Sequence, residues 1–401
     1  MPDPLVLFQT SDWHAGSPLT GHRLAWPAEL REVRREEVDG AAERAVNAAR
    51  DAGADALLVP GDLWEAENAP PSSIHRIVEA LASFAPRPVF IAPGNHDYAG
   101  PGGYYDPSVL AALGMRAWPE NVVVFRSDRW EHFPVPGRPD TVVVGRAFHP
   151  SPGEEIRPLA SPPPRPDTPY SVLLLHGSLD SYAGPDLPVG KKRVAPFTRE
   201  ELLAAGFSWT ALGHHHNLHT VDDDLGVVRA AYSGCPTGRG LDETGPRFFL
   251  KVTLDGAERT EVELVPSDAR TIRDLSLDAT DLDGRELAER ALALLAAEGV
   301  QAVDVVRLTL TGVLAYGARP AALQPVVAPS VAHAVLRDST TRPAAPGAAG
   351  RESAESRFTA SLLARREGAV EDERRVLDLA LRLGRDALAG RALTPPDPED
   401  A

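Results

Sequence analysis

Short apolar runs rich in Val, Leu and Ile alternate with helix-forming segments along the first half of the chain. Strand-like runs cover residues 5–9, 56–60, 89–92, 122–125, 142–145, 172–175 and 210–212, and helical patterns cover 33–52 and 72–84. This alternation is typical of α/β layering. Many of the runs end in Gly, His, Asn or Asp, and open α/β sheets bind ligands at the carboxyl ends of their strands. We therefore expect the functional site at that edge of the sheet.

The second half of the chain indicates further parts, as its 401 residues exceed the usual size of one domain. Alternating runs at 227–232, 247–252 and 261–265 predict paired antiparallel strands that close the first domain. Leu377, Leu381, Gly384 and Leu388 fall on one helical stripe near the C-terminus. The expected parts are a first domain over 1–267, a small α+β domain over 268–337, a Ser-, Pro-, Ala- and Gly-rich linker over 338–350 and a helical tail over 351–401.

Composition narrows the class of protein and its partners. Lys and Arg total 41 against 57 Asp and Glu, a net charge of -16, which argues against a broad basic surface for nucleic acid. A polyanionic substrate would need bound metal cations, a local basic patch or a partner subunit. Cys235 is the only cysteine, so no intrachain disulfide is expected. No run is long and apolar enough for a membrane span or a signal peptide, so we expect a cytoplasmic protein.

Five clusters of metal-ligand residues stand at or just after the ends of successive predicted strands. The clusters are Asp12-x-His14, Gly61-Asp62, Gly94-Asn95-His96-Asp97, His176-Gly177 and Gly213-His214-x-His216. A single Asp-x-His or Gly-Asp is a common cap or turn and carries little weight alone. The ordered series, with each cluster in the same context, is far more specific and predicts a metal centre.

The residue types indicate which metals and which chemistry. Imidazole nitrogens and carboxylate oxygens suit Mn, Fe and Zn, and the lack of cysteine ligands argues against a structural zinc site. In two-metal hydrolytic sites the ions lie about 3.5–4 Å apart, lower the pKa of a bridging water and neutralise a phosphoryl group. One carboxylate must bridge such a pair, and Asp62 is the best candidate for it.

The five clusters resemble the signature of the calcineurin-like metallophosphoesterases, over roughly the first 240 residues. The resemblance implies a four-layer αββα sandwich. It also implies two divalent ions, Mn(II) being the expected metal. One ion would be bound by Asp12, His14, Asp62 and His216, and the other by Asp62, Asn95, His176 and His214. His96 would contact the phosphate and protonate the leaving oxygen as the general acid.

The remaining histidines and one glutamate need separate treatment. His215 lies between two ligand positions and should point away from them if the segment is extended. His22, His75, His132, His149 and His219 match no family position and are interpreted as surface or core residues. Glu65 stands three residues after Asp62, where protein phosphatases of this superfamily place a carboxylate that orients the acid histidine. A hydrogen bond from His96 to Glu65 is therefore a hypothesis, with a solvated loop glutamate as the alternative.

Two stretches resemble the SbcD-type DNA repair nucleases within this superfamily. Residues 7–14 are similar to the opening of that family, with Arg34 and Asp39 in a similar helix, and residues 232–245 (Tyr-Ser-Gly-Cys-Pro through Glu-Thr-Gly) resemble its most specific run. The resemblance implies an exonuclease or endonuclease that processes DNA ends in double-strand-break repair. It further implies that the α+β domain caps the active site and orients DNA, that the tail docks on an SbcC-like, SMC-type ATPase, and that the chain forms a homodimer.

Several assignments stay open at this point. Lys191, Lys192, Arg193 and Arg239 are candidate phosphate contacts or solvated surface, and Tyr104 and Tyr105 either stack on a base or pack in the loop. The best-studied archaeal and eukaryotic members have a histidine at the position of Glu65, so the balance of exonuclease and endonuclease action is undecided. The alternatives to a nuclease are a phosphodiesterase or phosphatase for a small nucleotide or phosphoprotein, and a DNA-end adaptor that recruits an ATPase.

Overall fold

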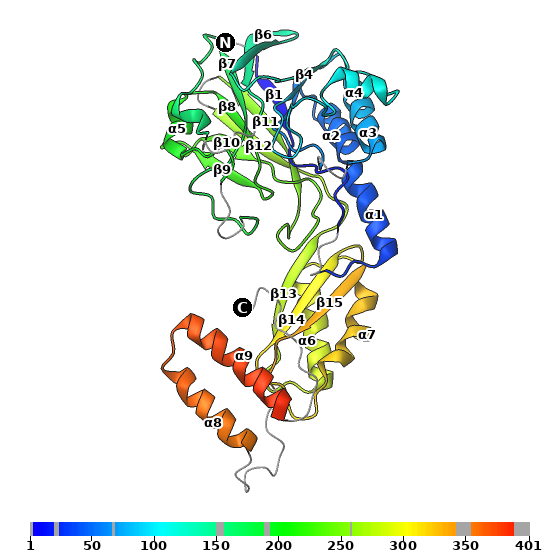
Figure 1. Ribbon diagram of the computed structural model, residues 1–401, viewed down its shortest axis with the longest axis vertical. Helices are drawn as coiled ribbons and strands as arrows, with labels where there is room; N and C mark the ends of the chain where they lie inside the picture. Colours follow the sequence, from blue (N-terminus) through cyan, green and yellow to red (C-terminus); the bar gives the residue numbers. More distant parts are fainter. Residues whose placement is uncertain are drawn as a thin grey trace. The chain divides into compact units, whose positions relative to one another are not determined.

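The computed structural model describes residues 3–19, 24–65, 69–149, 156–187, 193–256, 259–341 and 354–388. The chain forms two compact units (Figure 1), one made of Met1–Arg273 with Val303–Val305 and the other of Asp274–Ala302 with Val306–Ala401. The first unit runs past the boundary predicted at residue 267. The reason is a small apolar cluster in which Ile272 and Val305 are buried with Leu24 and Trp26.

The first unit contains two six-stranded sheets. The first sheet consists, in spatial order, of β12 (Arg259–Pro266), β11 (Phe248–Asp255), β1 (Leu5–Gln9), β2 (Ala56–Val59), β3 (Val89–Ile91) and β4 (Val122–Val124). Strands β1 to β4 run parallel, and β11 pairs antiparallel with both β1 and β12. The carboxyl ends of β1, β2 and β3 therefore lie at one edge.

The second sheet consists of β5 (Glu131–Val135), β6 (Arg138–Gly145), β7 (Tyr170–His176), β8 (Trp209–Gly213), β10 (Val228–Tyr232) and β9 (His219–Asp222). The expectation that residues 227–232 pair with the other late strands is wrong. Strand β10 runs parallel to β8 and forms a hairpin with β9. Alternating apolar residues show that a strand has a buried face, but they do not show which sheet it joins.

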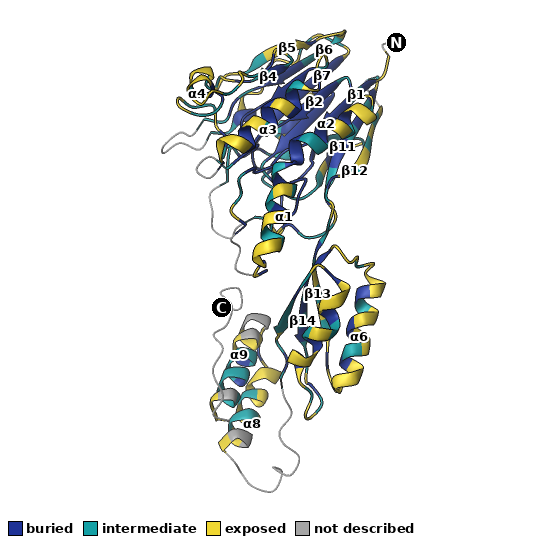
Figure 2. Cartoon of the chain, turned by 90° about the vertical axis from the view of Figure 1, so that its right-hand side faces the viewer, coloured by how far each residue is buried: buried dark blue, intermediate teal, exposed yellow. Residues whose placement is uncertain are grey.

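Alternate side chains of the strands enter different layers. On β7, Val172 and Leu174 lie in the core between the sheets, whereas Leu173 and Leu175 lie in the core on the outer side of the second sheet. The helices of this unit are α1 (Ala28–Asp39), α2 (Ala41–Asp51), α3 (Pro71–Ala82), α4 (Pro107–Ala112), the 3-10 turn η1 (Pro158–Ala160) and α5 (Arg199–Ala204). Figures 1 and 2 show α2 and α3 on one side of the largely buried strands, and Figure 1 shows α5 on the other. The predicted αββα sandwich is confirmed.

The helix predicted over residues 33–52 is divided in two. Helix α1 ends at Asp39 and α2 begins at Ala41, with Gly40 between them. Helix α2 carries the apolar face that packs on the sheet, with Ala42, Ala45, Val46 and Ala49 buried. Gly40 separates this packed helix from α1, in which the buried residues are Arg34 and Val38.

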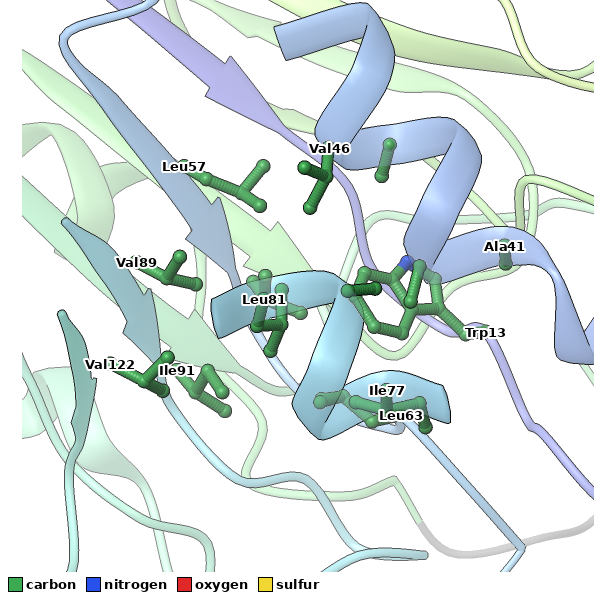
Figure 3. Close-up of a cluster of buried hydrophobic side chains, with 14 of the residues drawn as sticks. Trp13, Ala41, Val46, Leu57, Leu63, Ile77, Leu81, Val89, Ile91 and Val122 are labelled. Atoms are coloured by element: carbon green, nitrogen blue, oxygen red, sulfur yellow. The ribbon is translucent and has the colours of Figure 1, made fainter. Parts of the chain in front are cut away.

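The core outside the first sheet supports the loop after β1. Figure 3 shows Trp13 among side chains of α2, α3 and the parallel strands, including Val46, Ile77 and Leu81. The Trp13 ring is 1% exposed, and its Nε1 donates a hydrogen bond of 2.7 Å to Oγ1 of Thr10. Since Trp13 stands between Asp12 and His14, its burial fixes the position of both.

The second unit is a small α+β fold with a three-stranded sheet of order β13-β14-β15. Its elements are β13 (Ile272–Asp278), α6 (Gly284–Ala297), β14 (Val305–Thr311), η2 (Pro320–Leu323), α7 (Gln324–Val327), η3 (Ala328–Ser330) and β15 (His333–Asp338). Asp283 caps α6 by accepting hydrogen bonds from the backbone of Arg285 and Glu286. Leu287, Ala291 and Leu295 of α6 pack on β14.

The C-terminal helices α8 (Ala354–Glu367) and α9 (Glu371–Leu388) form a hairpin. Leu377 and Leu381 of the predicted stripe are buried, and a Cβ at Gly384 would overlap the Phe358 ring, whereas Leu388 is exposed. Most of the predicted linker, residues 342–350, lies outside the described residues. Among the described helices, none has the length and apolar character needed to cross a membrane.

Candidate metal centre

The five sequence clusters meet where the carboxyl ends of the two sheets approach each other. Three groups of side chains offer ligand atoms that lie within 4.8 Å of one another, and together they contain every predicted histidine and aspartate. The groups are Asp12, His14 and His216; His14, Asp62 and His96; and Asp62, His176 and His214. Asp62 and His14 each occur in two of them, and of these two residues only Asp62 offers a carboxylate that could bridge two ions.

The first group presents two imidazole nitrogens to a common point. Nε2 of His14 and Nε2 of His216 lie 3.2 Å apart. Each ring has a carboxylate 2.8 Å from its Nδ1, Glu65 for His14 and Glu243 for His216. The carboxylates favour the tautomer with the proton on Nδ1, as is usual for metal-binding histidines. At His216 the guanidinium of Arg239 opposes this, since its Nη2 lies 3.1 Å from the same Nδ1. Two Nε2 lone pairs at this distance are favourable only with a proton or a cation between them.

The group of Asp62, His176 and His214 presents an imidazole nitrogen to two oxygens. Nδ1 of His176 donates to the backbone oxygen of Pro60 at 2.9 Å, so Nε2 carries the lone pair in the neutral ring. That Nε2 lies 3.0 Å from Oδ1 of Asn95 and 3.4 Å from Oδ2 of Asp62. Nδ1 of His214 lies 3.2 Å from the same Asn95 oxygen. This donor set fits a divalent ion of the Mn, Fe or Zn type.

The loops that carry these ligands have an unusual backbone. Asp12, His14, Asp62 and His214 have φ values of 55°, 49°, 55° and 110°. A non-glycine residue in this region costs of order 1–3 kcal/mol, and such strain gathers at functional sites. The conformations are held by neighbouring loops, since the amide of His14 donates to the carbonyl of Asp62 at 3.0 Å.

Asp97 holds two of the ligand loops together, a role that the sequence did not reveal. Its carboxylate accepts hydrogen bonds from the amides of Asp62, Leu63 and Gly94 at 3.0, 3.0 and 2.6 Å, and from the hydroxyl of Tyr105 at 2.8 Å. Asp97 is 2% exposed. Its place directly after the Gly-Asn-His run was the available signal.

Burial and neighbouring charge set the protonation of the ligands. Burial raises the pKa of Asp12 to about 6, against the opposing effect of His176 and His216. Burial would also raise the pKa of Asp62, but nearby imidazoles, His176 first, outweigh it and hold the pKa below its ordinary value. Burial lowers the pKa of His14 to about 3, so its ring is neutral at pH 7, as a metal ligand must be.

His96 and Glu65 form the hydrogen bond that the sequence analysis put forward as a hypothesis. Nδ1 of His96 lies 2.8 Å from Oε2 of Glu65, while Oε1 of Glu65 is the atom facing His14. The Glu65 hydrogen bond raises the pKa of His96 to about 9, against the effect of burial. The His96 side chain is 41% exposed, in contrast to His14 and His176, each 1% exposed.

The run 232–245 closes over His216. Nδ1 of His216 contacts Glu243, and Glu243 in turn pairs with Arg239. Burial alone would raise the pKa of Glu243, but Arg239 and His216 hold it well below its usual value. Glu243 lies in the run that resembles the SbcD-type nucleases, but the sequence predicted no role for it. Its position four residues after Arg239 was the only local signal.

The other residues singled out from the sequence have varied positions. Tyr105 is 2% exposed and belongs to the loop core. Tyr104 is half-buried, packs against Trp64 and donates a hydrogen bond of 3.0 Å from its hydroxyl to the carbonyl of Ala69. His215 points away from the ligands and stacks on Tyr182 with ring centroids 3.7 Å apart.

Of the basic candidates, Arg193 bonds to Leu179 and Asp180, and Lys191 and Lys192 lie outside the described residues. Arg34 is fully buried and donates to the carbonyl of Gly238 at 2.8 Å. Asp39 accepts from the amide of Gly16 and the hydroxyl of Ser73. Arg34 and Asp39 therefore support loops of the site from α1.

A pocket opens beside His176. Its lining residues are Arg146, Ala147, Phe148, His149, Ile156, Pro158, Leu175, His176 and Ala195. The guanidinium of Arg146 lies 5.4 Å from the centre of the Trp130 ring. Burial lowers the pKa of Arg146 against the opposing charge of Asp128, and no carboxylate of the described residues forms an ion pair with it. A cation next to His176 suits an anionic ligand.

The sequence matches known proteins of one family. Residues 5–218 match the family model described as calcineurin-like phosphoesterase. The chain is 27% identical over 264 residues to YhaO of Bacillus subtilis (strain 168), described as an uncharacterized metallophosphoesterase, and the match covers 63% of this chain and 58% of that protein. The chain thus spans less than two thirds of the length of this relative.

Two solved structures are also similar. One is TT1561 of Thermus thermophilus, with a TM-score of 0.36 and 14% identity over 65% of this chain and 99% of that one. The other is a dimetal phosphatase from Danio rerio, with a TM-score of 0.38 and 13% identity over 66% of this chain and 100% of that one.

Proposed function

The chain belongs to the calcineurin-like phosphoesterase family, whose members are metal-dependent hydrolases, and from this premise we propose that it is a DNA nuclease. The proposed reaction is metal-dependent hydrolysis of phosphodiesters at DNA ends, as an exonuclease or an endonuclease, in double-strand-break repair. The observation that carries the phosphodiesterase part is the three adjoining groups of ligand-type side chains, two of which contain Asp62.

The proposed ligands are drawn from these groups, with the addition of Asn95. Asp12, His14, Asp62 and His216 hold one ion, and Asp62, Asn95, His176 and His214 hold the other. The first set places two imidazole nitrogens 3.2 Å apart, and the second surrounds one imidazole nitrogen with two oxygens. Mn(II) is the proposed metal, since these ligands suit it and the reaction needs no redox change.

Two divalent ions in such a site neutralise charge on the phosphoryl group and supply an activated water as the nucleophile. His96 acts as the general acid and protonates the leaving oxygen. Its exposure and its single side-chain hydrogen bond, to Glu65, support this role, because a general acid must reach the substrate without being consumed as a ligand. Glu65 keeps the imidazolium protonated at neutral pH and fixes the ring through Nδ1.

The choice of DNA as substrate rests on the parts beyond the ligand loops. The run 232–245, which resembles the SbcD-type nucleases, contacts the site through Arg239 and Glu243. Beyond it follow an α+β fold and a helical hairpin, which suit the proposed DNA-orienting and ATPase-docking parts. The net charge of -16 is consistent with shared DNA binding, in which an SMC-type ATPase supplies phosphate contacts to a homodimer of this chain.

A second candidate function is hydrolysis of a small nucleotide or a phosphoprotein. The pocket beside His176, with Arg146 on its wall, favours it because one phosphate would suffice to bind there. A DNA-end adaptor without catalysis is the weakest alternative, since the full set of ligand-type residues is brought together.

The deciding experiment compares substrates for one protein preparation. End-labelled duplex and single-stranded DNA, a cyclic nucleotide and a phosphopeptide are incubated with Mn(II), with and without the partner ATPase. His96→Ala is the matched control for catalysis. Cleavage of DNA, much faster than of the small substrates and lost in His96→Ala, is expected. Hydrolysis of only the small substrates would replace the nuclease proposal, and no hydrolysis of any of them would defeat both.

A further inference from the structure

Arg239 connects the two carboxylates that face the imidazoles of the first ligand group. Its Nη1 lies 3.5 Å from Oε1 of Glu65, the oxygen that lies 2.8 Å from Nδ1 of His14. Its Nε and backbone amide donate to Glu243, the amide at 2.7 Å, and Nη2 pairs with the same carboxylate. Glu243 lies 2.8 Å from Nδ1 of His216. One guanidinium thus links both orienting carboxylates.

Burial makes these contacts costly to lose. The side chain of Glu243 is 2% exposed and that of Arg239 is 12% exposed. An ionised carboxylate at this depth is stable only if a cation and hydrogen bonds compensate for its lost hydration. Arg239 supplies both, and ionised Glu243 in turn fixes the tautomer and the direction of the His216 ring.

The loop that carries Arg239 is itself held from a distance. Nε of the buried Arg34 donates to the carbonyl of Gly238, the preceding residue, at 2.8 Å. The amide of Gly238 donates to Asp268 at 2.9 Å. The guanidinium of Arg239 is therefore presented from a fixed backbone, as a positioning group must be.

The imidazoles of the other ligand set, His176 and His214, make different supporting contacts. Nδ1 of His176 donates to a backbone carbonyl, that of Pro60, and the His214 ring contacts the amide oxygen of Asn95. Neither contact involves a charged side chain. Among the described residues, an arginine outside the ligand set therefore supports the His14 and His216 pair, whereas these two contacts are made by a backbone carbonyl and by Asn95, itself a proposed ligand.

We propose that Arg239 is a positioning residue that sets the affinity of the Asp12, His14 and His216 group for its metal ion and leaves the His176 and His214 group unaffected. This inference rests on the proposed two-metal function. Arg239 acts through Glu65 and Glu243 and also contacts His216 directly, since its Nη2 lies 3.1 Å from Nδ1 of that ring. It does not itself bind the ion. Replacement of such supporting groups typically weakens metal binding about 10–100-fold.

The test is Mn(II) binding to the metal-free full chain, measured by calorimetry for the wild type and Arg239→Met. The wild type should bind two ions. Arg239→Met should bind one ion with unchanged affinity and the other about 10–100-fold more weakly, and the electron paramagnetic resonance signal of a coupled manganese pair should give way to that of a single ion. Arg239→Lys keeps the charge but cannot span both carboxylates, so its affinity for the more weakly bound ion should lie between those of the wild type and Arg239→Met. It is the test variant if Arg239→Met does not fold.

Two further variants make the result specific. Arg138 also links two carboxylates, Asp55 and Asp140, and its side chain is 16% exposed, so Arg138→Met is a matched control that should bind both ions normally. His176→Ala should lose the opposite ion from Arg239→Met, and the double variant should bind neither tightly.

The outcomes separate this inference from the function on which it rests. Wild-type affinity for both ions in Arg239→Met, with only a higher KM, would make Arg239 a substrate contact and overturn the inference. Equal weakening of both ions would also overturn it. A wild-type chain that binds fewer than two ions would instead contradict the proposed two-metal function.

Discussion

Oε2 of Glu65 lies 2.8 Å from Nδ1 of His96, and Oε1 of the same carboxylate lies 2.8 Å from Nδ1 of His14. One side chain therefore orients both a proposed metal ligand and the proposed general acid. The two imidazoles differ in burial, since the His14 side chain is 1% exposed and that of His96 is 41% exposed. The buried ring is held neutral, whereas the exposed ring is held protonated.

Glu65→Gln should lower kcat and move the alkaline limb of the rate profile to lower pH. The Glu65 hydrogen bond raises the pKa of His96 to about 9, so the acid form persists through neutral pH. Without the carboxylate charge, His96 should lose its proton at lower pH, and kcat at pH 8 should fall about 10–100-fold. The measurement is kcat from pH 6 to 10. Glu79→Gln, which changes an exposed glutamate, is the control, and an unshifted limb in Glu65→Gln would refute the assignment.

His96→Ala and Asp62→Asn should both lose hydrolytic activity, but for different reasons. His96→Ala removes the proposed acid, so it should retain two bound ions while kcat falls at least about 100-fold. Asp62→Asn weakens the shared ligand, so both ions should be lost together. Metal content after gel filtration distinguishes the two variants. Loss of metal in His96→Ala would make His96 a ligand, in line with its place in the His14 and Asp62 group.

Asp97→Ala should destabilise the fold without removing a ligand. The change leaves three buried amides and the Tyr105 hydroxyl without their acceptor, at about 1–3 kcal/mol for each buried group. We expect a loss of about 3 kcal/mol or more in the free energy of unfolding, measured by urea titration. Asp224→Ala, at a side chain 89% exposed, should change stability by less than about 0.5 kcal/mol. Similar small losses for both variants would show that Asp97 does not hold the loops.

The acid sensitivity of the fold should depend in part on Glu37. Burial would raise the pKa of this carboxyl, but hydrogen bonds from Arg270 and Arg34 outweigh it and lower the pKa. A lowered pKa in the folded state gives stability that is complete above the unfolded pKa, about 4.3–4.5, and is lost as the pH falls below it. Glu37→Gln should be about 2 kcal/mol less stable at pH 7. The difference should narrow as the pH falls from about 4.5 toward the lower folded pKa, and a constant difference over this range would contradict this.

The ligand positions were predictable because the metal-ligand residues lie in short runs of the sequence. Gly94-Asn95-His96 and Gly213-His214 each show a ligand next to a glycine at a strand end, and the glycine has a physical reason. A Cβ at Gly94 would overlap Oδ1 of Asp62 and the His176 ring. A position where the backbone approaches other groups this closely requires glycine, so it can be recognised in the sequence.

Apart from Glu65, the residues that support the ligands were not predictable, because their contacts span long distances along the chain. Glu243 supports His216 across a β-hairpin, and Arg34 reaches Gly238 from the first helix. A glutamate in a polar loop or an arginine in a charged helix is most often exposed, so nothing local identified either as buried. The same reasoning explains why strand β10 was assigned to the wrong partners, since its alternation fits either sheet.

The central claim is that this centre hydrolyses phosphodiesters with two metal ions held around Asp62. The most direct measurement is the rate of Mn(II)-dependent cleavage of end-labelled DNA by metal-stripped wild-type and Asp62→Asn proteins, each verified to be folded. The account predicts no cleavage without Mn(II), cleavage by the wild type when two equivalents are added, and at least about a 1000-fold lower rate in Asp62→Asn, since several kcal/mol of charge stabilisation is lost. Cleavage that is equally fast in Asp62→Asn, or independent of added metal, would contradict it.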